Sequence, residues 1–144
     1  MSIWHTQPEL GQLNTLQKKN TIAEVLGIEI TEIGDDYLKG IMPVDHRTHQ
    51  PMGILHGGAS VVLAESLGSM AANLVVDTGK QYCVGLDINA NHLRSMRSGQ
   101  VTGVAKPIHL GKSTQVWEIK ITDERDKPVC ISRLTMAVLS HRTD

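Results

Sequence analysis

Residues 57–76 read GGASVVLAESLGSMAANLVV and carry small or apolar side chains on nearly every side of a helix. A helix that is apolar all round is normally buried inside its protein. The length approaches that of a membrane span, but Glu65 near the middle and the lack of basic flanking residues argue against one. We therefore expect this helix to be wrapped by the rest of the chain.

The segments on both sides of this helix have the patterns of strands. Apolar and polar residues alternate, for example over residues 116–121, and turn-forming residues stand at 34–36 and 123–127. We expect strands at residues 28–33, 37–44, 82–89, 100–108, 114–122 and 129–139. The order β-β-α-β-β-β-β predicts an α+β fold, in which one long antiparallel sheet curls around the central helix.

Length and composition predict one domain over residues 1–144. The chain has 144 residues, of which 40% are hydrophobic, and a domain of this size buries roughly 70% of its unfolded surface. Residues 9–26 have a helix-like period that ends at Gly27, which indicates one or two short surface helices. We treat residues 1–23 as an N-terminal helical extension. One small domain has no interdomain cleft, so a large ligand must bind shallowly or between subunits.

Charge and composition exclude several classes of partner. The net charge is −1, and two Trp, two Tyr and no Phe leave few rings for stacking on bases. We therefore expect no nucleic-acid partner and no membrane partner. The start of the chain has no export signal, and Cys83 and Cys130 lie far apart in apolar runs. These features favour a soluble protein of the reducing cytoplasm.

Glu65 is the first candidate for chemistry. Glu is almost never fully buried unless it is paired or functional, and residues 61–64 beside it are all apolar. The alternative is a polar stripe with Ser66 and Ser69 that faces solvent or a subunit interface. Because a desolvated carboxylate near an electrophile is a usual general base or nucleophile, we favour a catalytic role.

The residues His56, Gly57 and Gly58 come directly before the helix. Glycines at a helix start leave backbone N–H groups open to an oxyanion, and the helix dipole adds to the attraction. Glu65 follows Gly57 by eight residues, which is about 12 Å along a helix, whereas both groups must lie about 3 Å from one carbonyl. If they cooperate, Glu65 comes from one subunit and Gly57 from its partner, in a dimer with two antiparallel helices.

Basic residues near two strand ends form a dispersed set of candidate phosphate ligands. Each one alone is typical of an ordinary solvated loop, but together they suit a polyphosphate, through charge-assisted hydrogen bonds. The set consists of His92, Arg94, Arg97, Lys106, His109 and Lys112.

Other signatures are incomplete. Residues 111–113 read GKS but lack the glycine that a phosphate loop has five residues earlier, and no GxSxG or GxGxxG occurs. His46, His49 and His56 have the right side chains for a metal, but Asp45 is the one carboxylate near them and no Cys is. We expect neither a metal nor a cofactor.

The stretch from Gln50 to Ser66, QPMGILHGGASVVLAES, resembles the signature of hotdog-fold acyl-CoA thioesterases, and more narrowly of the PaaI-like group with a Glu on the central helix. Residues 42–45, 84–94 and 107–117 match as well. The resemblance extends to the 1,4-dihydroxy-2-naphthoyl-CoA thioesterases of menaquinone synthesis and to the proofreading thioesterases of enterobactin synthesis. It implies the hotdog fold, a homodimer and a tetramer built as a dimer of dimers.

The resemblance also implies roles for particular residues. Glu65 would be the nucleophile or general base, and the N–H of Gly57 would polarise the thioester carbonyl. Gln50 and His56 would position the thioester or the water, and Ser69 would face the same pocket. The residues implied for the CoA groove are Gly85, His92, Leu93, Arg94, Ser95, His109, Leu110, Gly111, Lys112, Ser113 and Thr114.

Thioester hydrolysis suits these parts, because a thiolate leaves readily without a strong acid. We expect an acyl-CoA hydrolase for aromatic or similarly bulky acyl groups, such as 1,4-dihydroxy-2-naphthoyl-CoA. Met52, Leu67 and Met70 would shape the acyl pocket together with residues of a partner. The alternatives are a broad-specificity or proofreading thioesterase for carrier-protein-bound or medium-chain acyl groups, a hotdog hydratase, and a non-catalytic acyl-CoA binder.

Overall fold

The structure, a computed structural model, describes residues 1–142. Both predicted helical regions and all six predicted strands are present in it. The helices are α1 (Leu10–Gln17), α2 (Ile22–Leu26) and α3 (Gly57–Val75). The strands are β1 (Glu29–Ile33), β2 (Leu38–Pro43), β3 (Gln81–His92), β4 (Gln100–Leu110), β5 (Thr114–Thr122) and β6 (Pro128–Ser140).

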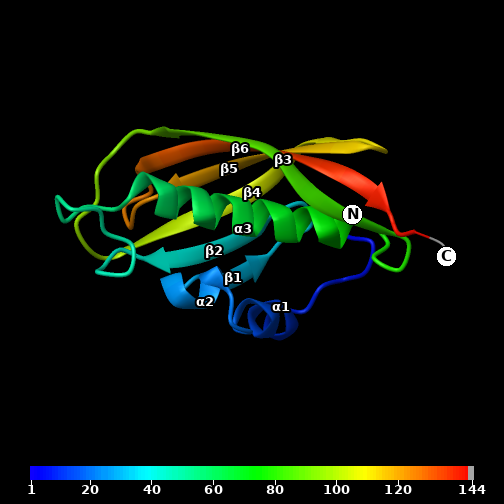
Figure 1. The fold of residues 1–144 in the computed structure, drawn as a ribbon, viewed down its shortest axis with the longest axis horizontal. Coiled ribbons are helices and arrows are strands. Elements are labelled where there is room, and N and C mark those ends of the chain that lie inside the picture. Colours follow the sequence, from blue (N-terminus) through cyan, green and yellow to red (C-terminus); the bar gives the residue numbers. More distant parts are fainter. Residues whose placement is uncertain (143–144) are drawn as a thin grey trace.

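The strands form one sheet in the order β1-β2-β4-β5-β6-β3, and all neighbours are antiparallel. The sheet curls around α3, which lies along its concave side (Figure 1). This arrangement confirms the predicted α+β hotdog fold. β3 is longer than predicted because it pairs with β6 along its whole length, from Gln81 opposite Ser140 to His92 opposite Cys130. Backbone pairing, rather than the side-chain pattern, therefore sets the ends of this strand.

The central helix is buried on one face only. The buried face packs on the sheet, whereas Val61, Val62, Glu65 and Ser69 on the other face are partly exposed. The expectation that α3 is buried on every side is therefore wrong for the single chain, because the sheet curls around one side of it. By length and composition α3 would also suit a membrane span, but the same properties fit a core helix. The buried residues of α3 are Ala59, Ser60, Leu63, Ala64, Leu67, Gly68, Ala71 and Ala72.

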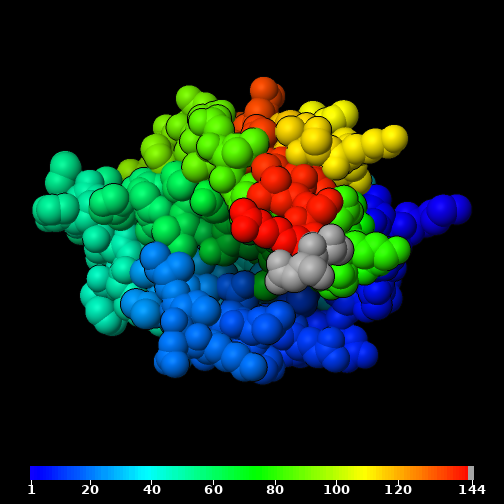
Figure 2. Space-filling model, turned by 45° about the vertical axis from the view of Figure 1, so that its right-hand side comes forward, coloured from blue at the N-terminus to red at the C-terminus, as the bar shows by residue number. Residues whose placement is uncertain are grey.

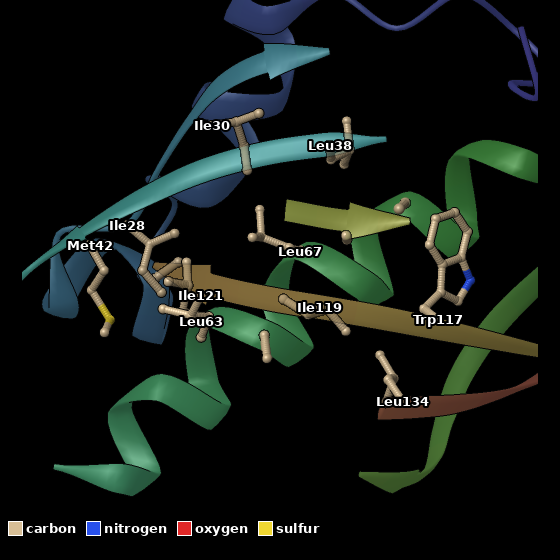
Figure 3. Packing of buried hydrophobic residues seen from close by; sticks show 14 of the residues in the cluster. Ile28, Ile30, Leu38, Met42, Leu63, Leu67, Trp117, Ile119, Ile121 and Leu134 are labelled. Atoms are coloured by element: carbon tan, nitrogen blue, oxygen red, sulfur yellow. The ribbon is translucent and has the colours of Figure 1, made fainter. Parts of the chain in front are cut away.

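Two glycines on neighbouring strands let α3 approach the sheet closely. Gly40 on β2 lies opposite Gly103 on β4. A Cβ atom placed on Gly40 would lie 2.9 Å from one methyl carbon of Leu67, and a Cβ atom placed on Gly103 would lie 2.8 Å from the other. The Leu67 side chain thus occupies the space that two side chains would otherwise take, among the core residues in Figure 3. This contact fixes the position of α3 over the sheet.

The N-terminal helices form a further layer beside β1 and α3 (Figure 1). The Asn14 side chain donates to the carbonyl of Ile30 and accepts from its N–H, both at 2.8 Å, and so ties α1 to β1. Thr21 caps α2 by accepting from the N–H of Glu24 at 3.2 Å. Gly27 ends α2 as predicted, in the left-handed conformation with φ of 76°. In Figure 2 this segment, in blue, lies below green residues of α3 that remain visible from outside.

Candidate active site

The start of α3 presents backbone donors, as the sequence predicts. His56 is the N-cap residue, and its Nδ1 accepts from the N–H of Gly58 at 2.8 Å. Nε2 is therefore the protonated nitrogen of the neutral ring. Gly57 is the first helical residue, so its N–H has no acceptor inside the helix. This N–H, at the positive end of the helix dipole, is suited to a carbonyl oxygen that gains negative charge.

The ring of His92 lies against Gly57. A Cβ atom on Gly57 would lie 2.7 Å from Nε2 of His92, so glycine is needed for this approach. The two residues share a cavity of about 380 Å³ with Leu93, Arg94 and Ser95, which follow β3. The structure thus brings the predicted oxyanion donor together with four residues predicted for the CoA groove.

Glu65 lies at the middle of α3 in a separate cavity of about 330 Å³, lined also by Ile22, Val61, Val62, Ser66 and Ser69. Within residues 1–142, no ion pair neutralises its carboxylate. Three apolar side chains, Ile22, Val61 and Val62, lie beside this partly exposed carboxylate, an arrangement that suits a general base or nucleophile. Ser69 shares this cavity with Glu65, as predicted.

The edge strand β3 passes close to Glu65. A Cβ atom on Gly85 would lie 3.6 Å from Oε1 of Glu65, so the glycine leaves room beside the carboxylate. Asn73, two turns after Glu65, holds this part of β3 in place. Its Nδ2 donates to the carbonyl of Cys83 at 3.2 Å, and its Oδ1 accepts from the N–H of Cys83 at 2.9 Å. The register of β3 against the helix is therefore set next to the site.

The remaining predicted CoA ligands lie on the β4–β5 hairpin. The turn closes with a hydrogen bond of 2.8 Å from the N–H of Gly111 to the carbonyl of Thr114, and it contacts β6 through Ser113, whose carbonyl accepts from Val138 at 2.9 Å. Val138 pairs with Cys83 on β3. The hairpin, including His109, Leu110 and Lys112, therefore belongs to the same end of the sheet as Gly85 and not to the end with His92.

The loop before α3 carries Gln50 and Met52. The side-chain oxygen of Gln50 accepts from the N–H of Met52, and Met52 is 76% exposed at the tip of this turn. Neither residue lines the cavity at Gly57 or the cavity at Glu65. The loop is anchored at its start, where hydrogen bonds from Arg47 lower the pKa of Asp45 to about 2. It is anchored at its end by a 2.8 Å bond from His56 N–H to the Thr48 carbonyl.

Leu67 does not shape the acyl pocket, and that prediction is wrong. It is fully buried between α3 and the sheet, on the side of the helix opposite to the cavities. Sequence reasoning missed the cavity residues Val61 and Val62, although their spacing of four and three residues before Glu65 places them on its face of the helix. It also missed Ile22, for which no local pattern exists, because α2 meets α3 only in the folded chain.

The structure offers no metal cluster within residues 1–142: no group of three or more His, Cys, Asp or Glu side chains converges there. Cys83 and Cys130 are both free and buried, and burial raises the pKa of each thiol. A thiol in this state is a poor nucleophile. The candidate chemistry therefore rests on Glu65 and on the start of α3.

A hotdog sheet around a helix that carries a partly exposed carboxylate and one free N–H at its start fits the class of thioester hydrolases, and the comparison with known proteins agrees. The chain belongs to the thioesterase superfamily, whose sequence model matches residues 52–130.

Individual relatives are similar over nearly the whole chain. The 1,4-dihydroxy-2-naphthoyl-CoA hydrolase of Escherichia coli is 54% identical over 95% of this chain and 99% of its own length. The proofreading thioesterase EntH of Cronobacter turicensis is 52% identical over 95% of this chain and 98% of its own. The crystal structure of a mutant of thioesterase PA1618 from Pseudomonas aeruginosa has a TM-score of 0.95 at 58% identity, covering 97% of this chain and 100% of that one. The protein is therefore an enzyme, a thioester hydrolase.

Proposed function

We propose that the protein hydrolyses acyl-CoA thioesters of bulky aromatic acids, such as 1,4-dihydroxy-2-naphthoyl-CoA, with Glu65 as the catalytic carboxylate. The observation that carries this proposal is the setting of Glu65, whose carboxylate has no ion pair within residues 1–142 and lies in a cavity with Ile22, Val61 and Val62, beside the glycine of the edge strand. The 54% identity to a 1,4-dihydroxy-2-naphthoyl-CoA hydrolase supports the substrate class.

Two routes are compatible with this geometry. As a general base, Glu65 takes a proton from water while the water oxygen attacks the thioester carbon. As a nucleophile, a Glu65 oxygen attacks that carbon, the C–S bond breaks, and water then hydrolyses the mixed anhydride. In both routes, negative charge develops on the carbonyl oxygen and CoA leaves as the thiolate. An N–H of Gly57 at a helix start would stabilise that oxygen.

We further propose that each site combines two chains. Gly85 lies beside Glu65 and His92 lies beside Gly57, and seven residues of strand separate these two positions by about 23 Å. β3 is an edge strand, with Tyr82, Val84 and Leu86 exposed. Antiparallel pairing of two β3 edges would bring the His92 end of one chain to the Gly85 end of the other. The partner's Gly57 would then approach Glu65, and Arg94 and the β4–β5 hairpin would meet around one CoA.

The test is a panel of acyl-CoA thioesters, with release of the CoA thiol as the readout. Glu65→Ala should lower kcat/KM at least about a hundredfold for every substrate that the natural protein hydrolyses. Glu65→Gln is the matched variant, because it keeps the shape and removes the charge. Activity within a few-fold of the natural protein in Glu65→Ala would disprove the assignment. In a single turnover in ¹⁸O-labelled water, label in the Glu65 carboxylate would identify the nucleophilic route, because water that attacks the Glu65 carbonyl of the anhydride leaves its oxygen there and the general-base route never does.

A second candidate is the removal of wrongly loaded acyl groups from a carrier protein. The 52% identity to a proofreading thioesterase favours it. The same panel with each acyl group on CoA and on a carrier protein distinguishes the two. A kcat/KM at least about tenfold higher on the carrier protein would favour proofreading. The free, buried cysteines suit the reducing cytoplasm, where we propose that the enzyme acts.

A further inference from the structure

A groove of about 440 Å³ separates the N-terminal helices from the open face of α3. Leu13, Leu16 and Ile22 form its wall on the α1–α2 side, and Met70 and Leu74 form its wall on α3. Most of the exposed wall is apolar. Leu16 and Ile22 are each 58% exposed, so the groove has an apolar wall that the chain itself leaves open.

This groove is continuous with the cavity of Glu65. Ile22, Ser66 and Ser69 line both of them. On α3 the lining continues to Asn73, which lies eight residues beyond Glu65 and so about 12 Å farther along the helix. A ligand whose reacting carbon is at Glu65 therefore has an apolar path that is longer than one aromatic ring.

The polar half of a CoA thioester cannot use this path. Its phosphates need charged partners, and the charged residues predicted for them, such as Arg94 and Lys112, lie outside the groove, whose lining contains no charged side chain. The acyl group leaves the carbonyl carbon on the side opposite to the sulfur. It is the part of the substrate whose chemistry matches an apolar wall.

We propose that the α1–α2 layer is the acyl-selectivity element of this enzyme, with Ile22 at the entrance of the groove and Leu16 deeper along it. The preferred acyl groups are uncharged and longer than one ring, either fused bicyclic aryl groups or medium alkyl chains. Residues 10–26 lie outside the segment that matches the superfamily, 52–130. The inference rests on the proposed role of Glu65.

Ile22→Trp tests the entrance. The readout is the ratio of kcat/KM for 2-naphthoyl-CoA and octanoyl-CoA to that for benzoyl-CoA, and it should fall at least about tenfold. Leu16→Ala should raise the ratio of kcat/KM for dodecanoyl-CoA to kcat/KM for octanoyl-CoA. Val25→Trp is the matched control: it lies on the same short helix, is 67% exposed and lies outside both cavities. It should leave all ratios unchanged.

Two outcomes overturn the inference. One is an Ile22→Trp enzyme whose ratios stay within about twofold, or which loses activity equally on all thioesters. The other is a change in subunit number by light scattering without a change in ratios, which would make the groove a contact between chains. Glu65→Ala in the same panel keeps the two proposals apart. If Glu65→Ala abolishes activity but Ile22→Trp leaves the kcat/KM ratios unchanged, only the proposed role of the groove is rejected. If Glu65→Ala keeps its activity, the proposed function itself is rejected.

Discussion

At the scale of single residues, Gly57 meets two requirements at once. Its position at the start of α3 leaves the N–H free, and its missing side chain leaves room for the ring of His92. A substitution therefore disturbs either the N–H or the contact with His92, and the two effects have different kinetic consequences. An oxyanion donor acts mainly on kcat, whereas a displaced binding residue acts mainly on KM.

Gly57→Pro should lower kcat about a hundredfold or more, because proline removes the N–H and with it the stabilisation of the oxyanion. Proline is well tolerated at the first helical position, and the extended conformation of His56, with ψ of 129°, suits a following proline. Steady-state kinetics on one acyl-CoA measure the effect. Gly57→Ala is the control, since it adds the same Cβ atom and keeps the N–H. Equal losses of kcat in both variants would rule out a role for this N–H.

At the scale of elements, the contact between α3 and the sheet sets where Glu65 lies. Leu67 follows Glu65 by two residues and inserts between Gly40 and Gly103 on the opposite side of the helix. Gly68 makes a similar approach, since a Cβ there would lie 2.7 Å from a methyl carbon of Leu134. Small residues thus let the helix pack closely on the sheet, and this packing fixes the rotation that turns Glu65 away from the core.

Gly103→Ala should destabilise the fold by about 1–3 kcal/mol, because the new methyl group overpacks the contact with Leu67. Urea unfolding followed by Trp fluorescence measures this change, and Trp117 in the core is a suitable probe because it is fully buried. Gly11→Ala on α1 is the matched control, since a Cβ there meets nothing within 4 Å. That control should be neutral or stabilising by up to about 1 kcal/mol. A midpoint for Gly103→Ala equal to that of the natural protein would contradict the close packing.

At the scale of the whole molecule, one chain holds the proposed parts of the site at two separate places. Glu65 and Gly85 lie at one place and Gly57 and His92 at the other. A two-fold axis across paired β3 edges would make two equal sites, each with one part from each chain. The exposed apolar residues of β3 and the partly exposed face of α3 support such an assembly. In such a dimer the partner chain would also cover the face of α3 that is partly exposed in the single chain.

Mixing Glu65→Ala with Gly57→Pro should therefore restore activity. In a mixed dimer, one site carries both defects and the other carries neither, so random pairing restores up to about one quarter of the natural sites. Subunits are exchanged by refolding the two variants together, and thiol release is then measured. A mixture of Glu65→Ala with Glu65→Gln is the control and should stay inactive. No recovery in the first mixture, despite proven mixed dimers, would show that each chain carries a complete site.

Local patterns alone determined much of this protein. The small and apolar residues of 57–76, the strand patterns and the glycine that ends α2 are short-range signals. The structure has the helix, the six strands and the helix end at these places, although α3 is buried on one face only. Glu65 and the His-Gly-Gly sequence stood out in the same way, because a charged residue in an apolar helix and glycines at its start are chemically conspicuous. Even the separation of Glu65 from Gly57 follows from the rise of a helix.

Only the tertiary structure decided which distant residues meet. It placed His92 on Gly57, Gly85 beside Glu65 and Ile22 at the cavity of Glu65, and it turned Leu67 into the sheet. These contacts depend on the rotation of α3 and on the register of the strands, which the closing of the whole sheet sets. Residues far apart in the chain contribute to that closure together, so no local stretch of sequence carries the information.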